Sequence, residues 1–399
     1  MQSGGKAAQS PAMDAPLSAA ETQADAAAGA GRAAEARRLL ETAVAETPDR
    51  AEAWLKLAAM CRATGDLQAG LAAVSRALAI DPLDFSALLS KAAMLERMGR
   101  SGEAGQAYGH ALAQRPPEDK TPAAMAPILA HAEAAYRRHQ EQSAALLRGS
   151  VPPDAGLDAD EARRVERFCT NFARLTKPYP QEPSHFHYPG LPAVEFHDRA
   201  HFPWLGALEA GTAEIRAELE ALLASEAAEL VPYVQYPDDV PLAQWRALNW
   251  SREWTAIHLL RNGARVERNA RHCPRTLALL GEAPQPDVPG RCPNAMFSLL
   301  APKTRIPPHT GVANTRLVCH LPLVVPAGCG FRVGAETRSW TPGEAFVFDD
   351  TIEHEAWNDS DELRVVLIFD VWPWALSAAE RTAVAAVMAG SDAPTSDGL

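Results

Sequence analysis

The sequence predicts a multidomain α plus β chain, in which N-terminal helical repeats precede a β-rich domain with flanking helices. The length of 399 residues favours two domains. A 34-residue period runs through the first third of the chain. Short apolar segments punctuated by Gly and Pro occupy residues 295–374, a pattern typical of a sandwich, jelly roll or small barrel.

Composition excludes several classes of protein. The chain is 47% hydrophobic and 22% charged, as folded proteins are. A formal net charge of −12 argues against nucleic acid or an anionic membrane surface as the main partner. No apolar run reaches the ~18 residues of a membrane span, and no secretory signal is evident. Six cysteines without a CxxC pair indicate reduced thiols, so we expect a cytoplasmic location.

Three columns of residues recur in register at the 34-residue period. Gly would form the turn between two helices, Ala would let them approach closely, and Pro would end the second helix. The pattern resembles the tetratricopeptide repeat, which implies a partner protein or peptide, although the repeats could equally serve only dimerisation or spacing. The columns are Gly31, Gly65 and Gly99; Ala43, Ala77 and Ala111; and Pro48, Pro82 and Pro116.

Composition also divides the chain. We expect a disordered N-terminus at 1–16, repeats over 17–147, a Pro- and Gly-rich linker at 148–157, a second domain over 158–385 and a flexible tail at 386–399. Helical patterns cover 158–175 and 208–223. The predicted strands are 295–300, 316–325, 330–333, 345–349, 354–357 and 363–372.

Two histidines and one arginine stand out in the second domain. His309 lies at a turn entering a strand, and His354 begins a later strand. Arg364 follows among apolar residues, where a buried guanidinium needs an anion. A protein carboxylate or the carboxylate of a bound ligand could supply that anion.

The motifs around these residues resemble the aspartyl/asparaginyl β-hydroxylase family. The resemblance covers roughly residues 180–375 and also includes Trp254 and a tetratricopeptide-like region before the domain. Its motifs are Phe297-Ser298, Pro307-Pro308-His309-Thr310-Gly311, Asn314-Thr315-Arg316-Leu317, His320-Leu321-Pro322, Trp340-Thr341-Pro342-Gly343-Glu344, Phe348-Asp349-Asp350, and His354-Glu355-Ala356-Trp357-Asn358.

This resemblance implies a 2-oxoglutarate- and Fe(II)-dependent dioxygenase on a double-stranded β-helix, the jelly-roll or cupin-like fold. Dioxygen would be consumed in hydroxylating a C–H bond, with the β-carbon of Asp or Asn in a protein or peptide as the expected target. The implied roles are His309 and His354 as iron ligands, Ser298 and Arg364 on the distal carboxylate of 2-oxoglutarate, His320 near its other end, and Arg316 and Trp254 lining the site.

Some positions leave the chemistry or the substrate open. The usual third iron ligand, a carboxylate two residues after the first His, is replaced by Gly311, as it is in the family. A second arginine of the family is replaced by Val318. We expect turn roles for Asp349 and Asp350, and solvated side chains at Glu353 and Glu355. The alternatives are a non-catalytic adaptor with a degenerate ligand-binding domain, or a hydroxylase of a lipid acyl chain or small molecule.

Overall fold

The computed structural model describes residues 17–225, 227–237, 239 and 243–392. It divides into two compact units between Thr176 and Lys177. The predicted disordered N-terminus at 1–16 lies outside the described residues, as does the end of the predicted tail, 393–399.

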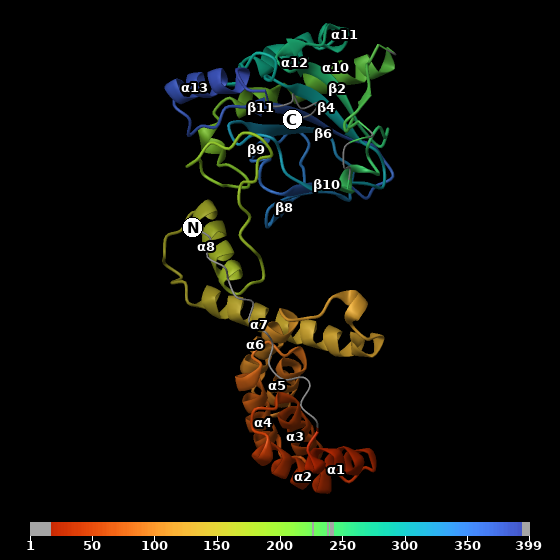
Figure 1. Cartoon of the computed structure of the whole chain (residues 1–399). Coiled ribbons are helices and arrows are strands. Elements are labelled where there is room, and N and C mark those ends of the chain that lie inside the picture. Colours follow the sequence, from red (N-terminus) through yellow and green to blue (C-terminus); the bar gives the residue numbers. More distant parts are fainter. Residues whose placement is uncertain (1–16, 226, 238, 240–242, 393–399) are drawn as a thin grey trace, which may run out of the picture. The chain divides into compact units, whose positions relative to one another are not determined.

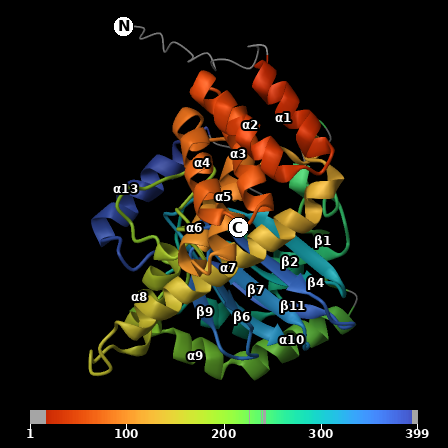
Figure 2. The ribbon, with the colours of Figure 1, turned by 90° about the horizontal axis from the view of Figure 1, so that it is seen from below.

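The first unit is a series of helices, each of which packs against the next in the chain (Figures 1 and 2). Short 3₁₀ turns at Glu118–Lys120 and Ala123–Met125 precede α7. The helices are α1 (Ala19–Gly29), α2 (Ala33–Glu46), α3 (Ala51–Ala63), α4 (Leu67–Ile80), α5 (Phe85–Arg97), α6 (Ser101–Leu112), α7 (Ala126–Gly149) and α8 (Ala159–Phe172).

The recurring residues occupy the positions that helical hairpins require. Gly31, Gly65 and Gly99 have φ angles of +75°, +83° and +73°, the left-handed region that L side chains rarely adopt. Each follows the first helix of a pair and forms its turn. Ala43 and Ala77, in the second helices, are fully buried between neighbours.

The predicted linker lies inside this unit. Helix α8 begins with a capping box, in which Asp158 caps the Glu161 amide and Glu161 bonds back to the Asp158 amide. It then packs against α7, and Arg148 forms an ion pair with Glu166 at 2.5 Å. The compact unit therefore extends through Thr176, beyond the boundary expected at 148–157.

Helix α6 approaches α7 so closely that only glycine fits at residue 105. A Cβ at Gly105 would lie 2.3 Å from His139 Cβ, an atom that cannot rotate away. We expect Gly105→Ala to lower the free energy of unfolding by about 1–3 kcal/mol, as overpacking does. Gly102→Ala is the matched control in the same helix, because a Cβ there meets nothing within 4 Å.

Urea unfolding followed by the fluorescence of Trp54, with the other tryptophans replaced by Phe, measures both variants. Gly102→Ala should stabilise by about 1 kcal/mol, because alanine is the better helix former. Equal effects of the two substitutions would contradict the close packing.

Within the described residues, the strands of the second unit form two antiparallel sheets (Figure 1). The larger has the order β1-β2-β4-β11-β6-β9, with β3 paired to β2, and the smaller has the order β5-β10-β7-β8. Their strands are β1 (Val231–Pro232), β2 (Trp254–Arg261), β3 (Ala264–Arg265), β4 (Ala295–Leu300), β5 (Thr304–His309), β6 (Leu317–Val324), β7 (Cys329–Val333), β8 (Glu336–Arg338), β9 (Phe346–Phe348), β10 (His354–Asn358) and β11 (Arg364–Val371).

The larger sheet separates two cores because side chains alternate along each strand. Odd-numbered residues such as Phe297 and Leu367 pack against helices that cover one face, while even-numbered residues such as Met296 and Val366 face the smaller sheet. The remaining elements are a 3₁₀ turn at Arg199–His201, α9 (Leu205–Ala210), α10 (Thr212–Ala224), a 3₁₀ turn at Ala243–Trp245, α11 (Glu267–Ala270), α12 (Pro274–Leu280) and α13 (Ala378–Ala389).

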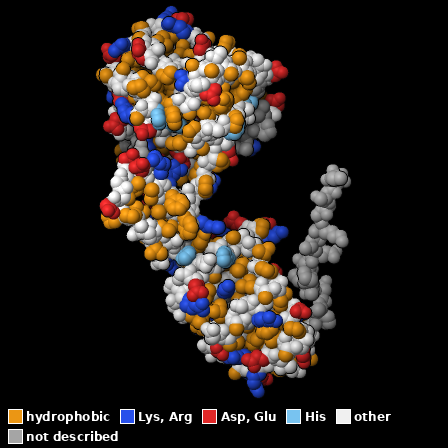
Figure 3. All heavy atoms as spheres, turned by 90° about the vertical axis from the view of Figure 1, so that its left-hand side faces the viewer, with side chains coloured by type: hydrophobic (Ala, Val, Ile, Leu, Met, Phe, Trp, Pro, Cys, Tyr) orange, Lys and Arg blue, Asp and Glu red, His pale blue; other side chains and the backbone are white. Residues whose placement is uncertain are grey.

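The expected strands all form, each within a few residues of its predicted ends. Helix α13 continues through residue 386, where we expected the tail to begin. Every helix in the described part of the chain is too short or too polar to cross a bilayer. On the face drawn in Figure 3, acidic and basic side chains are interspersed.

Candidate active site

His309 and His354 come together although 45 residues separate them along the chain. His309 is the last residue of β5, His354 is the first residue of β10, and the two are direct partners across the antiparallel ladder. Their ring centroids lie 4.0 Å apart. The strand register thus places both imidazoles at the same end of two neighbouring strands of the smaller sheet.

Hydrogen bonds orient both rings in the same way. His309 Nδ1 lies 2.8 Å from the Pro307 carbonyl oxygen and His354 Nδ1 lies 3.1 Å from the Ile352 carbonyl oxygen. Because a carbonyl only accepts, each Nδ1 carries the proton and each Nε2 keeps its lone pair. Burial lowers the pKa of His354 to about 4 and that of His309 well below its usual value. Both rings are therefore neutral at pH 7.

Two neutral imidazoles with their Nδ1 atoms held by carbonyls suit a divalent transition metal, whose bound histidines show this arrangement. In the described residues, no group of three or more His, Cys, Asp or Glu side chains is placed to hold an ion. A Cβ at Gly311 would lie 2.1 Å from the Asp350 carboxylate, so Asp350 fills the space beside it. The two histidines are the protein donors that fit.

Arg364, the first residue of β11, is a buried cation with two nitrogens that lack a hydrogen-bond partner. It is 2% exposed, and Nε and Nη1 make no hydrogen bond. Its guanidinium carbon lies 4.9 Å from the centre of the Trp340 ring. Burial lowers the pKa of Arg364 to about 10, so it stays charged at pH 7. A buried cation of this kind requires an anion.

Ser298 lies on the strand next to Arg364 and on the same face of the sheet. It is the direct partner of Val366, two residues beyond Arg364 on β11. The Ser298 hydroxyl accepts a 3.0 Å hydrogen bond from Trp254 Nε1, so its own proton remains available to a carboxylate. Trp254 is held in turn by Tyr233, stacked at 3.7 Å.

His320 on β6 completes the set on this face. Its Nδ1 accepts a 3.3 Å hydrogen bond from Trp340 Nε1, so its Nε2 carries the proton and acts as a donor. Burial, together with the charge of Arg364, holds the pKa of His320 well below its usual value. Trp340 therefore contacts both Arg364 and His320, a role that the sequence did not predict although the residue lies in a recognised motif.

Arg316 finds its partner in a protein carboxylate. Its Nη2 lies 3.1 Å from Asp350 Oδ2, and both side chains are almost fully buried. Burial raises the pKa of Asp350, and the positive charge of Arg316 opposes that rise. The neighbouring Asp349 accepts bonds from the Thr351 amide and hydroxyl at 2.9 and 2.6 Å, which is the turn role expected of it.

The expectation of solvated side chains at Glu353 and Glu355 was wrong. Both are half-buried, and both form ion pairs with Arg332 of β7. These ion pairs join β10 and the residue before it to β7, so the sequence around Glu353 and Glu355 does not predict them.

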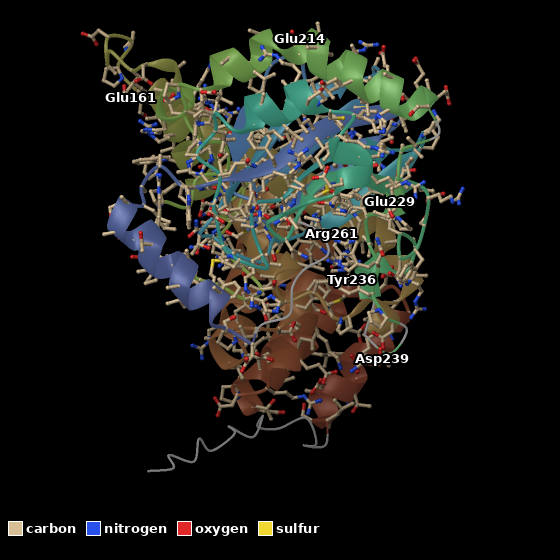
Figure 4. The ribbon with its side chains drawn as sticks, turned by 90° about the horizontal axis from the view of Figure 1, so that it is seen from above. Glu161, Glu214, Glu229, Tyr236, Asp239 and Arg261 are labelled. Atoms are coloured by element: carbon tan, nitrogen blue, oxygen red, sulfur yellow. The ribbon has the colours of Figure 1, made fainter. Side chains whose placement is uncertain are left out.

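An aromatic segment between β1 and β2 borders His309. The Trp245 ring lies 5.0 Å from the His309 ring, edge to face. The exposed Trp250 has a φ of +56°, and its indole nitrogen donates to the Tyr236 carbonyl at 3.0 Å. Figure 4 labels Tyr236 in this segment and Arg261 at the end of β2. Sequence reasoning missed Trp245, and the nearby cluster of tryptophans was the available signal.

Two histidines of the second unit, His197 and His201, contact Trp374. His201 stacks on its ring at 3.9 Å, and His197 Nδ1 accepts from its indole nitrogen at 3.3 Å. Burial lowers the pKa of His197 to about 4. These contacts are those of side chains packed into the structure.

Protonation of His197 should therefore oppose folding. The unfolded state binds its proton near pH 6.5 and the folded state near 4. The stability that the neutral His197 side chain gives to the folded state is fully present above pH 6.5, and it is lost as the pH falls toward 4. Between these limits the wild type should lose up to about 3 kcal/mol more stability than His197→Phe.

Urea unfolding at pH 7, 6, 5 and 4.5 measures this difference, followed by tryptophan fluorescence, since eight of the nine tryptophans lie after residue 177. His187→Phe is the control because the His187 side chain is exposed. Parallel pH profiles for the wild type and His197→Phe would refute the assignment.

Fold and site together define a protein in which helical repeats precede a two-sheet domain. That domain holds a pair of histidines and a buried arginine without a hydrogen-bonded anion. The family model described as Aspartyl/Asparaginyl beta-hydroxylase matches residues 209–373, and the Tetratricopeptide repeat model matches residues 27–95. The chain thus carries a domain of the aspartyl/asparaginyl β-hydroxylase family preceded by tetratricopeptide repeats, as the sequence motifs predicted. All seven predicted site residues lie within 209–373.

Relatives of known name share this domain. An ornithine lipid ester-linked acyl 2-hydroxylase of Rhizobium tropici is 36% identical over 184 residues, which are 45% of this chain and 60% of that protein. Human aspartate beta-hydroxylase domain-containing protein 2 is 34% identical, over 52% of this chain and 55% of its own length. Human aspartyl/asparaginyl beta-hydroxylase is 32% identical, over 46% of this chain and 24% of its own length. The chain therefore spans less than two thirds of each of these relatives.

Solved structures match the repeats. The tetratricopeptide domain of Arabidopsis OM64 is 20% identical and covers 31% of this chain and 93% of its own, with a TM-score of 0.26. That of Sgt2 from Aspergillus fumigatus is 21% identical and covers 35% and 87%, with a TM-score of 0.27. The family model, and not these scores, identifies the repeats.

Proposed function

We propose that the second unit is a 2-oxoglutarate- and Fe(II)-dependent dioxygenase that hydroxylates a C–H bond, with the β-carbon of an Asp or Asn side chain in a protein or peptide as target. The observation that carries the proposal is that a pair of neutral imidazoles and a buried, charged Arg364 belong to one cluster of side chains. Arg364 contacts Trp340, Trp340 stacks on Phe331, and Phe331 contacts His354. We further propose that the two sheets form a double-stranded β-helix. A cytoplasmic location stays a prediction.

The donor atoms fit both groups. His309 and His354 would hold the iron through Nε2, because their Nδ1 protons are committed to carbonyls. The guanidinium of Arg364 and the hydroxyl of Ser298 would bind the distal carboxylate of 2-oxoglutarate, since both face the same side of the larger sheet. His320 Nε2 would donate a hydrogen bond near its other end.

When bound, iron and 2-oxoglutarate supply the oxidising chemistry that places one atom of dioxygen into a C–H bond and the other into succinate, with loss of carbon dioxide. The chain's own residues would position the two bound groups and shield them from water. Trp254 and Trp340 hold Ser298 and His320 by hydrogen bonds. The surrounding apolar core, which includes Phe348 and Ile306, excludes water.

Release of succinate from 2-oxoglutarate tests the proposal. We expect release only with added Fe(II), and faster release with peptides that contain Asp or Asn, accompanied by a 16 Da gain on the peptide. Absence of both turnover and metal binding would instead support the adaptor.

A second candidate is hydroxylation of an acyl chain. It is favoured by the similarity to the Rhizobium tropici enzyme and by Val318, a buried apolar residue where the family has an arginine. An acyl lipid offered in the same assay separates the two candidates. Recruitment of a protein or peptide by the repeats is likewise proposed from the family match to residues 27–95.

A further inference from the structure

Asn358, the last residue of β10, lies where the two sheets meet. Its side chain is fully buried. Its backbone belongs to the smaller sheet, opposite Cys329 of β7 and Thr304 of β5. Its Nδ2 reaches across to the larger sheet and donates to the Leu300 carbonyl at 3.0 Å. A single amide therefore links the strand that begins with His354 to the sheet that holds Arg364.

Every polar atom of this amide is used. Nδ2 also donates to the Ala301 and Glu362 carbonyls at 3.1 and 2.8 Å. Oδ1 accepts from the Ser360 amide and hydroxyl at 3.1 and 2.6 Å and from Cys329 Sγ at 3.3 Å. Carbonyls on one side and donors on the other suit an amide and no other side chain of this size.

These bonds define where β11 begins. Ser360 and Glu362 lie in the turn between β10 and β11, and the Glu362 carbonyl is two residues before Arg364. Leu300 is the direct strand partner of both Arg364 and Trp254. Asn358 thus holds the residue between two members of the proposed 2-oxoglutarate site, and the turn that leads into one of them.

We propose that Asn358 is a positioning residue, which sets the distance and orientation of Arg364 relative to the histidine pair and so determines the affinity for 2-oxoglutarate. This rests on the proposed function. His354 lies at the opposite end of β10 from Asn358, and His309 lies at the far end of the neighbouring β5, so Asn358 should affect the cosubstrate and not the metal.

The test measures binding by the full-length chain. In anaerobic titrations, Asn358→Ala should weaken 2-oxoglutarate binding in the presence of Fe(II) at least about tenfold, the effect of losing one or two buried hydrogen bonds. The affinity for Fe(II), measured without 2-oxoglutarate, should change less than about twofold. In turnover, KM for 2-oxoglutarate should rise more than kcat falls.

Asn269→Ala is the matched control. Asn269 is equally buried, accepts from the Glu229 amide and donates to the His258 carbonyl, both at 2.9 Å, and lies on α11 away from Arg364. Figure 4 labels Glu229. The control should lose stability and keep its affinity for 2-oxoglutarate.

Ser360→Ala supplies a milder variant should Asn358→Ala fail to fold, because it removes only the hydroxyl that donates to Asn358 Oδ1 and Glu362. It should weaken 2-oxoglutarate binding less than Asn358→Ala. Hydrogen exchange of the ligand-free chain should speed up at residues 359–364 in both variants and not in Asn269→Ala.

If Ser360→Ala and Asn358→Ala both bind 2-oxoglutarate normally and show normal hydrogen exchange at 359–364, the positioning role of Asn358 is overturned. The proposed function would then still stand. Equal weakening in Asn269→Ala would also overturn the positioning role, because the effect would then be one of general stability. A wild-type chain that binds no 2-oxoglutarate would overturn the proposed function, and this role with it.

Discussion

Replacement of His354 by alanine is expected to abolish turnover and to lower the affinity for Fe(II) by more than about 100-fold, since even the loss of a residue that only orients a metal ligand costs 10–100-fold. The same holds for His309→Ala, because in the described residues no third side chain joins these two rings in a metal-holding group. Isothermal titration with Fe(II) under nitrogen measures the affinity, and succinate release measures the turnover.

His187→Ala is the control for both substitutions, because that imidazole is exposed in the same unit. It should bind Fe(II) as the wild type does. Retention of metal by either His309→Ala or His354→Ala would show that the proposed centre lies elsewhere.

Arg364→Met should change stability and binding in opposite directions. In the ligand-free chain the guanidinium pays a desolvation cost without an ion pair, so an apolar side chain of similar volume should raise the free energy of unfolding by about 1–4 kcal/mol. Loss of the contact with Trp340 reduces that gain by about 1 kcal/mol. Binding of 2-oxoglutarate should weaken by about 2–5 kcal/mol, or roughly 30-fold to several thousand-fold.

Arg332→Met is the matched control, since Arg332 already has Glu353 and Glu355 as partners. The substitution should destabilise the chain by leaving two half-buried carboxylates without a cation. Urea unfolding with and without 2-oxoglutarate measures all three proteins. A ligand-free Arg364→Met chain that is less stable than the wild type would mean that Arg364 serves the fold and not a ligand.

The predicted elements followed from local patterns, and the errors occurred where a neighbouring strand determined the outcome. We expected His309 to lie at a turn entering a strand, and Pro307 and Pro308 before it lack amide protons. The segment is nevertheless strand β5, which lies at the edge of the smaller sheet, where a missing donor can face away from the ladder. Strand β2 was missed because both of its faces are buried, so apolar and polar residues do not alternate along it.

In the candidate site, too, local patterns account for some features, while contacts between distant segments determine the others. Spacing alone could not bring His309 to His354, and their pairing was expected only from the family resemblance. Alternation along strands explains why Trp254, Ser298, His320 and Arg364 share one face, since direct strand partners point the same way. Contacts such as Trp340 with His320, or Asn358 with Leu300, join segments far apart in the sequence, and no local pattern shows them.

All six cysteines are buried free thiols. Burial raises the pKa of Cys273 to about 12 and that of Cys319 well above its usual range, so little reactive thiolate forms at neutral pH. The native chain should accordingly withstand peroxide and alkylating reagents, a property that would suit the proposed use of dioxygen. Iodoacetamide would then label these sulfurs only when the structure opens. The rate of labelling would therefore measure the rate of opening.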